Sequence, residues 1–184
     1  MVESTRTRIH ASEYYQLPEY AEHDLIQLIE GEVIVGMPPR TKHQDIVREL
    51  LIFLGLYARK SGGKAYDSPI ELYLDEQNIY EPDVLYLKPN SRCAVEEKRL
   101  VGPPELIVEV LSPSTAKYDR QQKFRAYERH AVEEYWIVDA LHNLIEVFVL
   151  TDSKFQLQGA YSPDDTFVSL VLGESVNVKL FFAE

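Results

Sequence analysis

The stretch Leu106-Ile107-Val108-Glu109-Val110-Leu111 decides the fold class of this chain. It is a continuous apolar run broken by one acid, and such a run is typical of a central strand that is buried on both faces. An ionised carboxylate in an apolar strand is costly unless something compensates it, and a metal ion is a good compensator. The alternative is that Glu109 lies at a strand end, where it is hydrated or paired with an arginine.

Helices and further strands are predicted on both sides of this run. Residues 41–60 form the clearest helix, because Ile46, Leu50 and Leu54 recur at helical spacing and Gly62-Gly63 follow as a stop. A polar helix is predicted over residues 114–130 and a buried strand over residues 135–138.

The remaining predicted elements are short and mostly extended. They are a helix over 12–20, a hairpin of 25–29 and 33–35 around Gly31, strands over 65–67, 70–74 and 80–87, and a terminal antiparallel meander of 144–150, 155–160 and 176–182. This order predicts one α/β domain over residues 1–184, with a mixed β-sheet flanked by helices and an antiparallel β-meander.

Composition excludes several classes of protein. The 184 residues are 45% hydrophobic, which argues against disorder, and the single cysteine, Cys93, cannot form an intramolecular disulfide. Residues 1–10 are charged, so no signal peptide is visible, and no apolar run approaches the roughly 20 residues of a membrane span. We therefore expect a cytoplasmic protein with no membrane partner.

The formal net charge of −11 opposes binding to a phosphate backbone. A nucleic-acid enzyme with this charge needs a local basic surface or bridging metal ions. Two clusters could form such a surface, although solvated helix faces are the ordinary alternative. The clusters are Arg40, Lys42, His43 and Arg48, and Lys117, Arg120, Lys123 and Arg125.

A second acid, Asp83, follows Pro82 and precedes the apolar residues 84–87. Two carboxylates on neighbouring strands and one backbone carbonyl provide the sparse oxygen shell that Mg²⁺ accepts while it keeps its waters. Lys123 is a candidate for the group near the attacking water, because it shares a helix face with Tyr127, four residues on. The alternative is a solvated helix lysine.

Taken together, these segments resemble the Uma-type endonuclease family, a large bacterial group within the PD-(D/E)XK nuclease superfamily. The resemblance covers roughly residues 15–148. The matching segments are residues 28–32, Pro38-Pro39, His43-Gln44, Glu81-Pro82-Asp83-Val84, residues 104–114, Asp119, Lys123, Tyr127 and residues 134–139.

The resemblance implies a restriction-endonuclease-like fold and hydrolysis of nucleic acid, DNA in the first instance. It implies that Asp83 and Glu109 are the paired metal ligands, with the Val110 carbonyl completing the set for Mg²⁺ or Mn²⁺. Glu32 resembles an additional acid that many members bring from the N-terminal segment. The superfamily also makes a homodimer plausible, because two sites can then address two strands.

The superfamily usually has a lysine two residues after the second acid, and this chain has Leu111 there. In the family that lysine has moved to the following helix, which matches Lys123, and we expect it to orient the water or neutralise the scissile phosphate. His43 matches a position that could touch a phosphate, with Arg40, Lys42 and Arg120 as further backbone contacts. Ala131 departs from the family, which has glycine there, but this affects a helix exit.

Three further polar residues have weaker interpretations. Asp119 is predicted to cap or begin its helix, where the helix dipole favours an acid. Ser112 and Ser114 are predicted to form a turn rather than a nucleophilic site, because no histidine with a partnering acid stands near them in the sequence.

Two other functions compete with the nuclease. The first is a catalytically silent nucleic-acid-binding or regulatory module with the same fold, and the second is a metal-free interaction protein.

Overall fold

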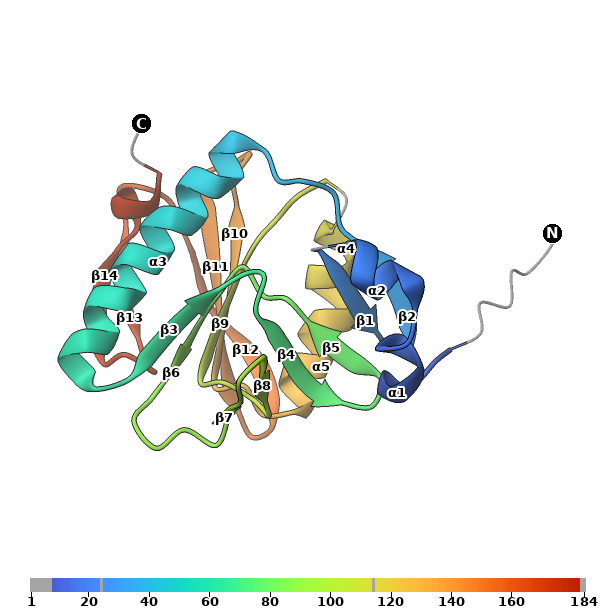
Figure 1. Cartoon of the computed structure of the whole chain (residues 1–184). Coiled ribbons are helices and arrows are strands. Elements are labelled where there is room, and N and C mark those ends of the chain that lie inside the picture. The colour runs from blue at the N-terminus through green and yellow to red at the C-terminus, as the bar shows by residue number, and fades with distance from the viewer. Residues whose placement is uncertain (1–7, 24, 114, 183–184) are drawn as a thin grey trace.

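The computed structural model describes residues 8–23, 25–113 and 115–182. These residues form two six-stranded sheets and one two-stranded sheet, with helices packed around them (Figure 1). Both larger sheets are mixed, because each contains one parallel strand pair among antiparallel ones. The predicted α/β class with mixed strands flanked by helices is confirmed, in two sheets where we expected one.

The first large sheet, which we call the central sheet, contains the strand that carries Glu109. Its strand order is β12 (Lys154–Tyr161), β11 (Leu144–Thr151), β10 (Glu134–Asp139), β9 (Leu106–Val110), β6 (Val84–Leu87) and β3 (Lys64–Asp67). The strand β9 runs parallel to β10 and antiparallel to β6. All five of its residues are buried, as the apolar run predicted.

Alternation along β9 divides the core between two faces. Leu106, Val108 and Val110 pack with the helix α3 (Thr41–Ser61) and the C-terminal residues. Ile107 packs on the other face with Ala126 and Tyr127. Because successive side chains of a strand point to opposite faces, Glu109 belongs to this second face.

The second large sheet, which we call the flanking sheet, lies beside the central one. Its order is β2 (Glu32–Val35), β1 (Ile26–Ile29), β5 (Asn78–Tyr80), β4 (Glu71–Asp75), β8 (Arg99–Val101) and β7 (Ala94–Val95). The β1–β2 hairpin is confirmed. Its two turn residues, Glu30 and Gly31, have φ angles of 50° and 80°, as a two-residue hairpin turn that matches the strand twist requires.

Proline explains two differences from the predicted elements. The single strand expected over residues 80–87 is two strands, β5 and β6, which lie in different sheets. Pro82 cannot donate to a strand ladder, and the chain crosses from one sheet to the other at this point, with Asp83 at the junction. Likewise the expected helix over 12–20 is split into α1 (Ala11–Tyr14) and α2 (Pro18–Glu22), because Pro18 begins a new helix.

The C-terminal segment also differs from the prediction. Residues 176–182 do not add a strand to the meander of β10, β11 and β12. Instead β14 (Glu174–Asn177) pairs with β13 (Thr166–Ser169), and the 3₁₀ helix η2 (Val178–Phe181) follows. Val176, Val178 and Phe181 are buried in the core that contains α3, so burial against the helix outweighs extension of the sheet.

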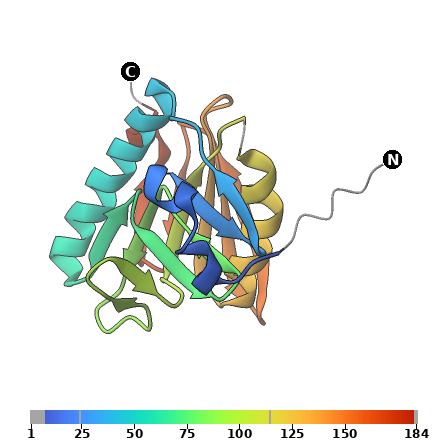
Figure 2. The ribbon, with the colours of Figure 1, turned by 45° about the vertical axis from the view of Figure 1, so that its right-hand side comes forward.

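The helix predicted over 114–130 is interrupted. It consists of α4 (Ala116–Tyr118), the π-helix η1 (Asp119–Lys123) and α5 (Phe124–Arg129), and Ser114 lies outside the described residues. Ala131, at the helix exit, has a φ of 61°, a left-handed conformation that favours glycine. Figure 2 shows this helical segment and α3 on opposite sides of the molecule.

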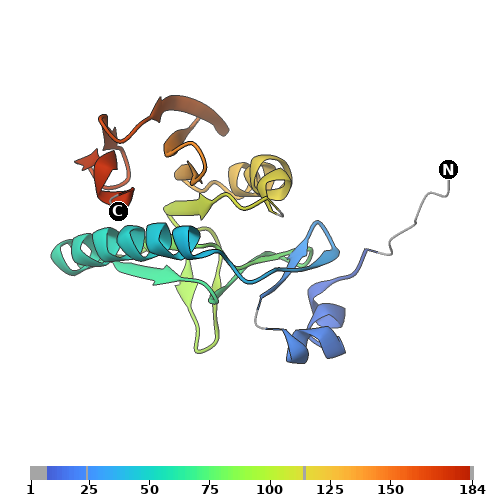
Figure 3. The same ribbon diagram turned by 90° about the horizontal axis from the view of Figure 1, so that it is seen from above.

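Seen from above, residues 36–40 run from β2 to the first turn of α3 (Figure 3). They connect the flanking sheet to a helix that packs on the central sheet. Within the described ranges, none of the helices is both long enough and apolar enough to span a membrane.

Candidate active site

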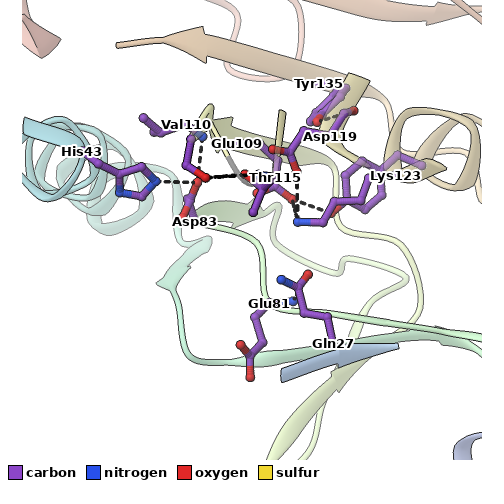
Figure 4. Close-up of polar contacts among 12 residues, drawn as sticks. Gln27, His43, Glu81, Asp83, Glu109, Val110, Thr115, Asp119, Lys123 and Tyr135 are labelled. Carbon is purple, nitrogen blue, oxygen red and sulfur yellow. Dashed lines mark hydrogen bonds and ion pairs between the residues drawn. The ribbon is translucent and has the colours of Figure 1, made fainter. Parts of the chain in front are cut away.

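Glu109 is the buried centre of a polar cluster on the inner face of β9. Its side chain is 3% exposed, and its Oε1 accepts hydrogen bonds from Lys123 Nζ at 2.9 Å and from the Tyr127 hydroxyl at 2.7 Å. Both partners come from the helical segment that packs on this face (Figure 4). The acid is therefore paired inside the core rather than hydrated at a strand end.

Lys123 lies between two buried carboxylates. Its Nζ is also 3.2 Å from Asp119 Oδ1, and both Lys123 and Asp119 are almost fully buried. The two residues are the first and last of the π-helical turn η1, a local widening that recurs at functional sites. The Thr115 side chain hydrogen-bonds Asp119, and the Tyr135 hydroxyl donates to the Asp119 carbonyl at 3.2 Å.

Asp83 joins this cluster from the neighbouring strand. Val84 pairs with Val108 in antiparallel register. Asp83, the residue before Val84, therefore lies beside Glu109, the residue after Val108. The Asp83 Oδ2 atom accepts a 2.7 Å hydrogen bond from the Val110 amide and lies 3.3 Å from His43 Nε2. The side chain of Asp83 is 20% exposed, which makes it the accessible acid of the pair.

The cluster shifts the pKa values of its members. Burial raises the pKa of Glu109 to about 7; Lys123 acts against this shift, while Asp119 and Asp83 reinforce it. Burial lowers the pKa of Lys123, but the carboxylates of Glu109 and Asp119 outweigh it, and the net shift is upward. Lys123 therefore keeps its positive charge in a site that is otherwise crowded with acids.

His43 has a similar balance. Burial lowers its pKa, but the hydrogen bond to Asp83 and the charge of that carboxylate, together with the Val110 backbone and Glu109, raise it by more, so that the pKa lies above the ordinary value of 6.5. Its Nδ1 atom is buried and has no hydrogen-bond partner among the described residues. The ring is thus held against Asp83 through one nitrogen, at the start of α3.

These groups line a cavity of about 390 Å³ between the two large sheets. Asp83, Glu109, Lys123 and His43 lie on one side. Gln27 and Glu81 lie across from the row of ion pairs, and Gln27 Oε1 accepts from the Glu81 amide at 3.2 Å (Figure 4). The described lining residues are Leu25, Gln27, Gly36, Met37, Pro38, Pro39, Arg40, His43, Gln44, Val47, Asp67, Ser68, Pro69, Glu81, Asp83, Glu109, Ser112, Pro113, Thr115 and Lys123.

The structure brings together most of the predicted site residues, but not all of them. Glu32 pairs with Ile29 beside the hairpin turn and is not among the described lining residues. It lies at the opposite end of β2 from Gly36, which does line the cavity, and on the same face of the hairpin as Gln27, since Ile34 pairs with Gln27 and Glu32 with Ile29. The role expected for Glu32 stays a prediction.

The predicted basic residues also divide. Arg40 and His43 line the cavity, whereas Lys42 donates to Asn143 Oδ1 at 2.9 Å and Arg120 forms an ion pair with Glu146. Lys42 and Arg120 therefore bond to other parts of the surface, and neither is a described lining residue.

Sequence reasoning missed three groups of this site. Asp119, which we expected to act as a helix cap, is a buried partner of Lys123 instead. Its spacing of four residues from Lys123 was the available signal, because an acid and a lysine at that spacing share a helix face. Tyr127 was assigned to the core without its hydrogen bond to Glu109, and Gln27 carried no signal.

Another buried acid, Glu71, lies outside this cluster. The Tyr15 hydroxyl is 3.4 Å from its Oε2 atom, and its Oε1 atom has no hydrogen-bond partner among the described residues. Burial raises the pKa of Glu71, although Tyr20, Tyr15 and Arg99 act against this shift. Glu71 is not among the residues that line the cavity.

The donor set fits a hard divalent cation. Within residues 8–23, 25–113 and 115–182, no group of three or more His, Cys, Asp or Glu side chains is arranged to hold a metal ion. Two carboxylates and the Val110 carbonyl nevertheless suit Mg²⁺, which binds few protein oxygens and retains several waters. Burial is the largest cause of the raised pKa of Glu109, with smaller contributions from Asp119 and Asp83, and a bound cation would favour the ionised form of this carboxyl group.

Comparisons with known proteins agree with this architecture. The model of the Uma2 family, described as "Putative restriction endonuclease", matches residues 11–179. The uncharacterized protein sll1609 of Synechocystis is 30% identical over 141 residues, which cover 76% of this chain and 79% of that protein. Another protein of the same organism, slr1290, is 31% identical over 111 residues, which cover 59% of this chain and 57% of that protein.

A solved structure has the same fold. It is the crystal structure of a protein from Anabaena variabilis, described as a putative nuclease belonging to DUF820. The TM-score is 0.76 at 18% sequence identity, and the match covers 95% of this chain and 98% of the other.

Proposed function

The chain belongs to the Uma2 family of restriction-endonuclease-like proteins, and we propose that it is a metal-dependent endonuclease that hydrolyses phosphodiester bonds of nucleic acid, DNA in the first instance. One observation carries the proposal. A buried strand acid, Glu109, converges with Asp83 and a charged lysine at a cavity wall. A purely structural acid in a core strand needs one partner, and here two carboxylates, Glu109 and Asp119, pair with one ammonium group while a third, Asp83, lies beside them.

Asp83, Glu109 and the Val110 carbonyl would hold Mg²⁺ or Mn²⁺. When bound, such an ion acidifies a water molecule and offsets negative charge that develops on the phosphate. Glu32 is not among the described lining residues, and we expect this additional acid to act on the ion directly or through a water molecule.

The protein's own cations act on the phosphate. Lys123 has its ammonium fixed between Glu109 and Asp119, so it can donate a hydrogen bond to a phosphate oxygen or to the attacking water without first reorganising. Arg40 is exposed at the start of α3 and supplies a positive charge at the cavity rim. These local positive charges would favour phosphate binding at the cavity, although the net charge of −11 opposes it at long range.

Nicking of a supercoiled plasmid tests the proposal, with Mg²⁺ or Mn²⁺ added or chelated. We expect cleavage by the wild type that needs the metal, loss of cleavage in Asp83→Asn and Glu109→Gln, and normal cleavage in Glu96→Gln, a surface control. Separately, Mg²⁺ should raise the melting temperature of the wild type, and Asp83→Asn should abolish that shift. A wild type that neither cleaves nor responds to metal contradicts the proposal.

The same measurements distinguish the nuclease from the alternative, a catalytically silent nucleic-acid-binding module. A silent module would bind labelled nucleic acid without cleaving it in either metal. A homodimer is part of the proposal as well, and light scattering coupled to size exclusion measures it directly.

A further inference from the structure

The cavity at the candidate active site has two chemically different walls. The wall from the central sheet and the helical segment η1 carries Asp83, Glu109 and Lys123. The facing wall comes from the flanking sheet and from residues 36–40, and it combines apolar residues with three polar ones. Its members are Leu25, Gly36, Met37, Pro38 and Pro39, together with Gln27, Arg40 and Glu81.

Residues 36–40 are held at both ends. The Gly36 amide donates to the Leu25 carbonyl at 2.7 Å, next to the β1–β2 hairpin. At the other end the Arg40 carbonyl accepts from the Gln44 amide in the first turn of α3. Two consecutive prolines between these anchors restrict the backbone further. The backbone of residues 36–40 is therefore held in place between β2 and α3, a path that can be followed in Figure 3.

The charged groups lie deep. Glu109 and Lys123 are 3% and 2% exposed, whereas Met37 on the opposite rim is 72% exposed. An intact duplex presents its phosphates on the outside of a wide, stiff cylinder with the bases stacked inside. A flexible single strand reaches groups at the base of a cavity that is walled on the other side more easily than such a cylinder does. Enzymes that act on base atoms inside a duplex likewise use single strands or extrude the nucleotide.

The apolar rim suits the face of a nucleobase. Methionine and proline side chains insert between bases in proteins that unstack nucleic acid. Gln27 adds a polar contact, because its Oε1 accepts from the Glu81 amide and its NH₂ group then remains as a donor. Figure 4 shows the Gln27 amide directed toward the row that contains Asp83 and Glu109. A volume of about 390 Å³ is within the range of small-molecule sites and suits one nucleotide.

We propose that this cavity binds one unstacked nucleotide, with its base against Met37 and Leu25 and its phosphate against Lys123. The substrate is then single-stranded nucleic acid, or a strand at a bulge or flap, and an intact duplex is a poor substrate. This inference rests on the proposed nuclease function and narrows its substrate class.

Matched oligonucleotides test the inference. One labelled strand is offered alone, in a perfect duplex, and in a duplex with a three-nucleotide bulge, each as DNA and as RNA. We expect cleavage of the single strand and of the bulge to be at least about tenfold faster than cleavage of the duplex. The DNA and RNA arms decide which sugar the site accepts.

Met37→Ser should slow cleavage of the single strand by about tenfold, since it removes most of the apolar surface on which the base would pack. Leu170→Ser is the matched control, because Leu170 is 64% exposed in the turn between β13 and β14 and does not line the cavity. The Mg²⁺-induced rise in melting temperature should be unchanged in both variants, which separates loss of base contact from loss of the metal site.

Binding without turnover extends the test. Fluorescence anisotropy with the Glu109→Gln protein compares the same three substrates. Equal affinity for duplex and single strand, or a Met37→Ser protein that cleaves and binds like the wild type, overturns the inference and leaves the nuclease proposal standing. Failure of every substrate to bind or be cleaved overturns both.

Discussion

Replacement of Lys123 by methionine removes the cation that two buried carboxylates share and keeps the shape of the side chain. The Nζ atom lies 2.9 Å from Glu109 and 3.2 Å from Asp119, and at an effective dielectric constant of about 20 each attraction is worth about 5–6 kcal/mol. Desolvation of the ions offsets several kcal/mol of this gain, and removal of one partner from a buried pair costs about 3–5 kcal/mol. We expect Lys123→Met to lose that amount of unfolding free energy.

Urea denaturation followed by Trp136 fluorescence measures the loss. With a slope of about 2 kcal/mol per molar, the midpoint should fall by about 1.5–2.5 M and the slope should stay the same. Lys154→Met is the matched control, because Lys154 is 70% exposed and pairs with Glu128 at 2.8 Å on the surface. An exposed pair contributes about 0–1 kcal/mol. Equal, small losses in the two variants would refute the reasoning from burial.

Three other substitutions test single contacts by the same denaturation assay. Tyr127→Phe removes the 2.7 Å hydrogen bond to Glu109 and should cost about 1–3 kcal/mol, and a variant as stable as the wild type would contradict this. Ala131→Gly should stabilise the protein by about 0.5–1 kcal/mol, because φ at this position is 61°, and a loss of stability would speak against that cause. Burial raises the pKa of Glu71 above 4.5, so its stabilising contribution is complete below that pH and is lost as pH rises through the folded value. The stability of Glu71→Gln relative to the wild type should therefore increase as pH rises above 4.5, and a difference independent of pH would exclude this linkage.

Local patterns in the sequence predicted the central strand and its neighbours. The run 106–111 indicated a strand buried on both faces, because its residues are almost all apolar and do not alternate with polar ones. All of β9 is buried. Gly31 between two extended runs indicated a hairpin, since a two-residue turn of this kind needs positive φ angles. The regular spacing of apolar residues predicted α3 to within a residue of its end. These features depend on neighbours within a few positions along the chain.

Only the tertiary structure decided which polar residues share the site. An acid four residues before a lysine has the same local pattern whether the pair is hydrated or buried, and packing of η1 onto β9 places Asp119 and Lys123 in the core. The break at Pro82 sends β5 and β6 into different sheets, and this positions Asp83 beside the Val110 amide. Contacts between residues far apart in sequence depend on how sheets and helices pack, and no local pattern records that packing. For the same reason Glu32, close to Gln27 in the sequence, is not among the described residues that line the cavity with Gln27.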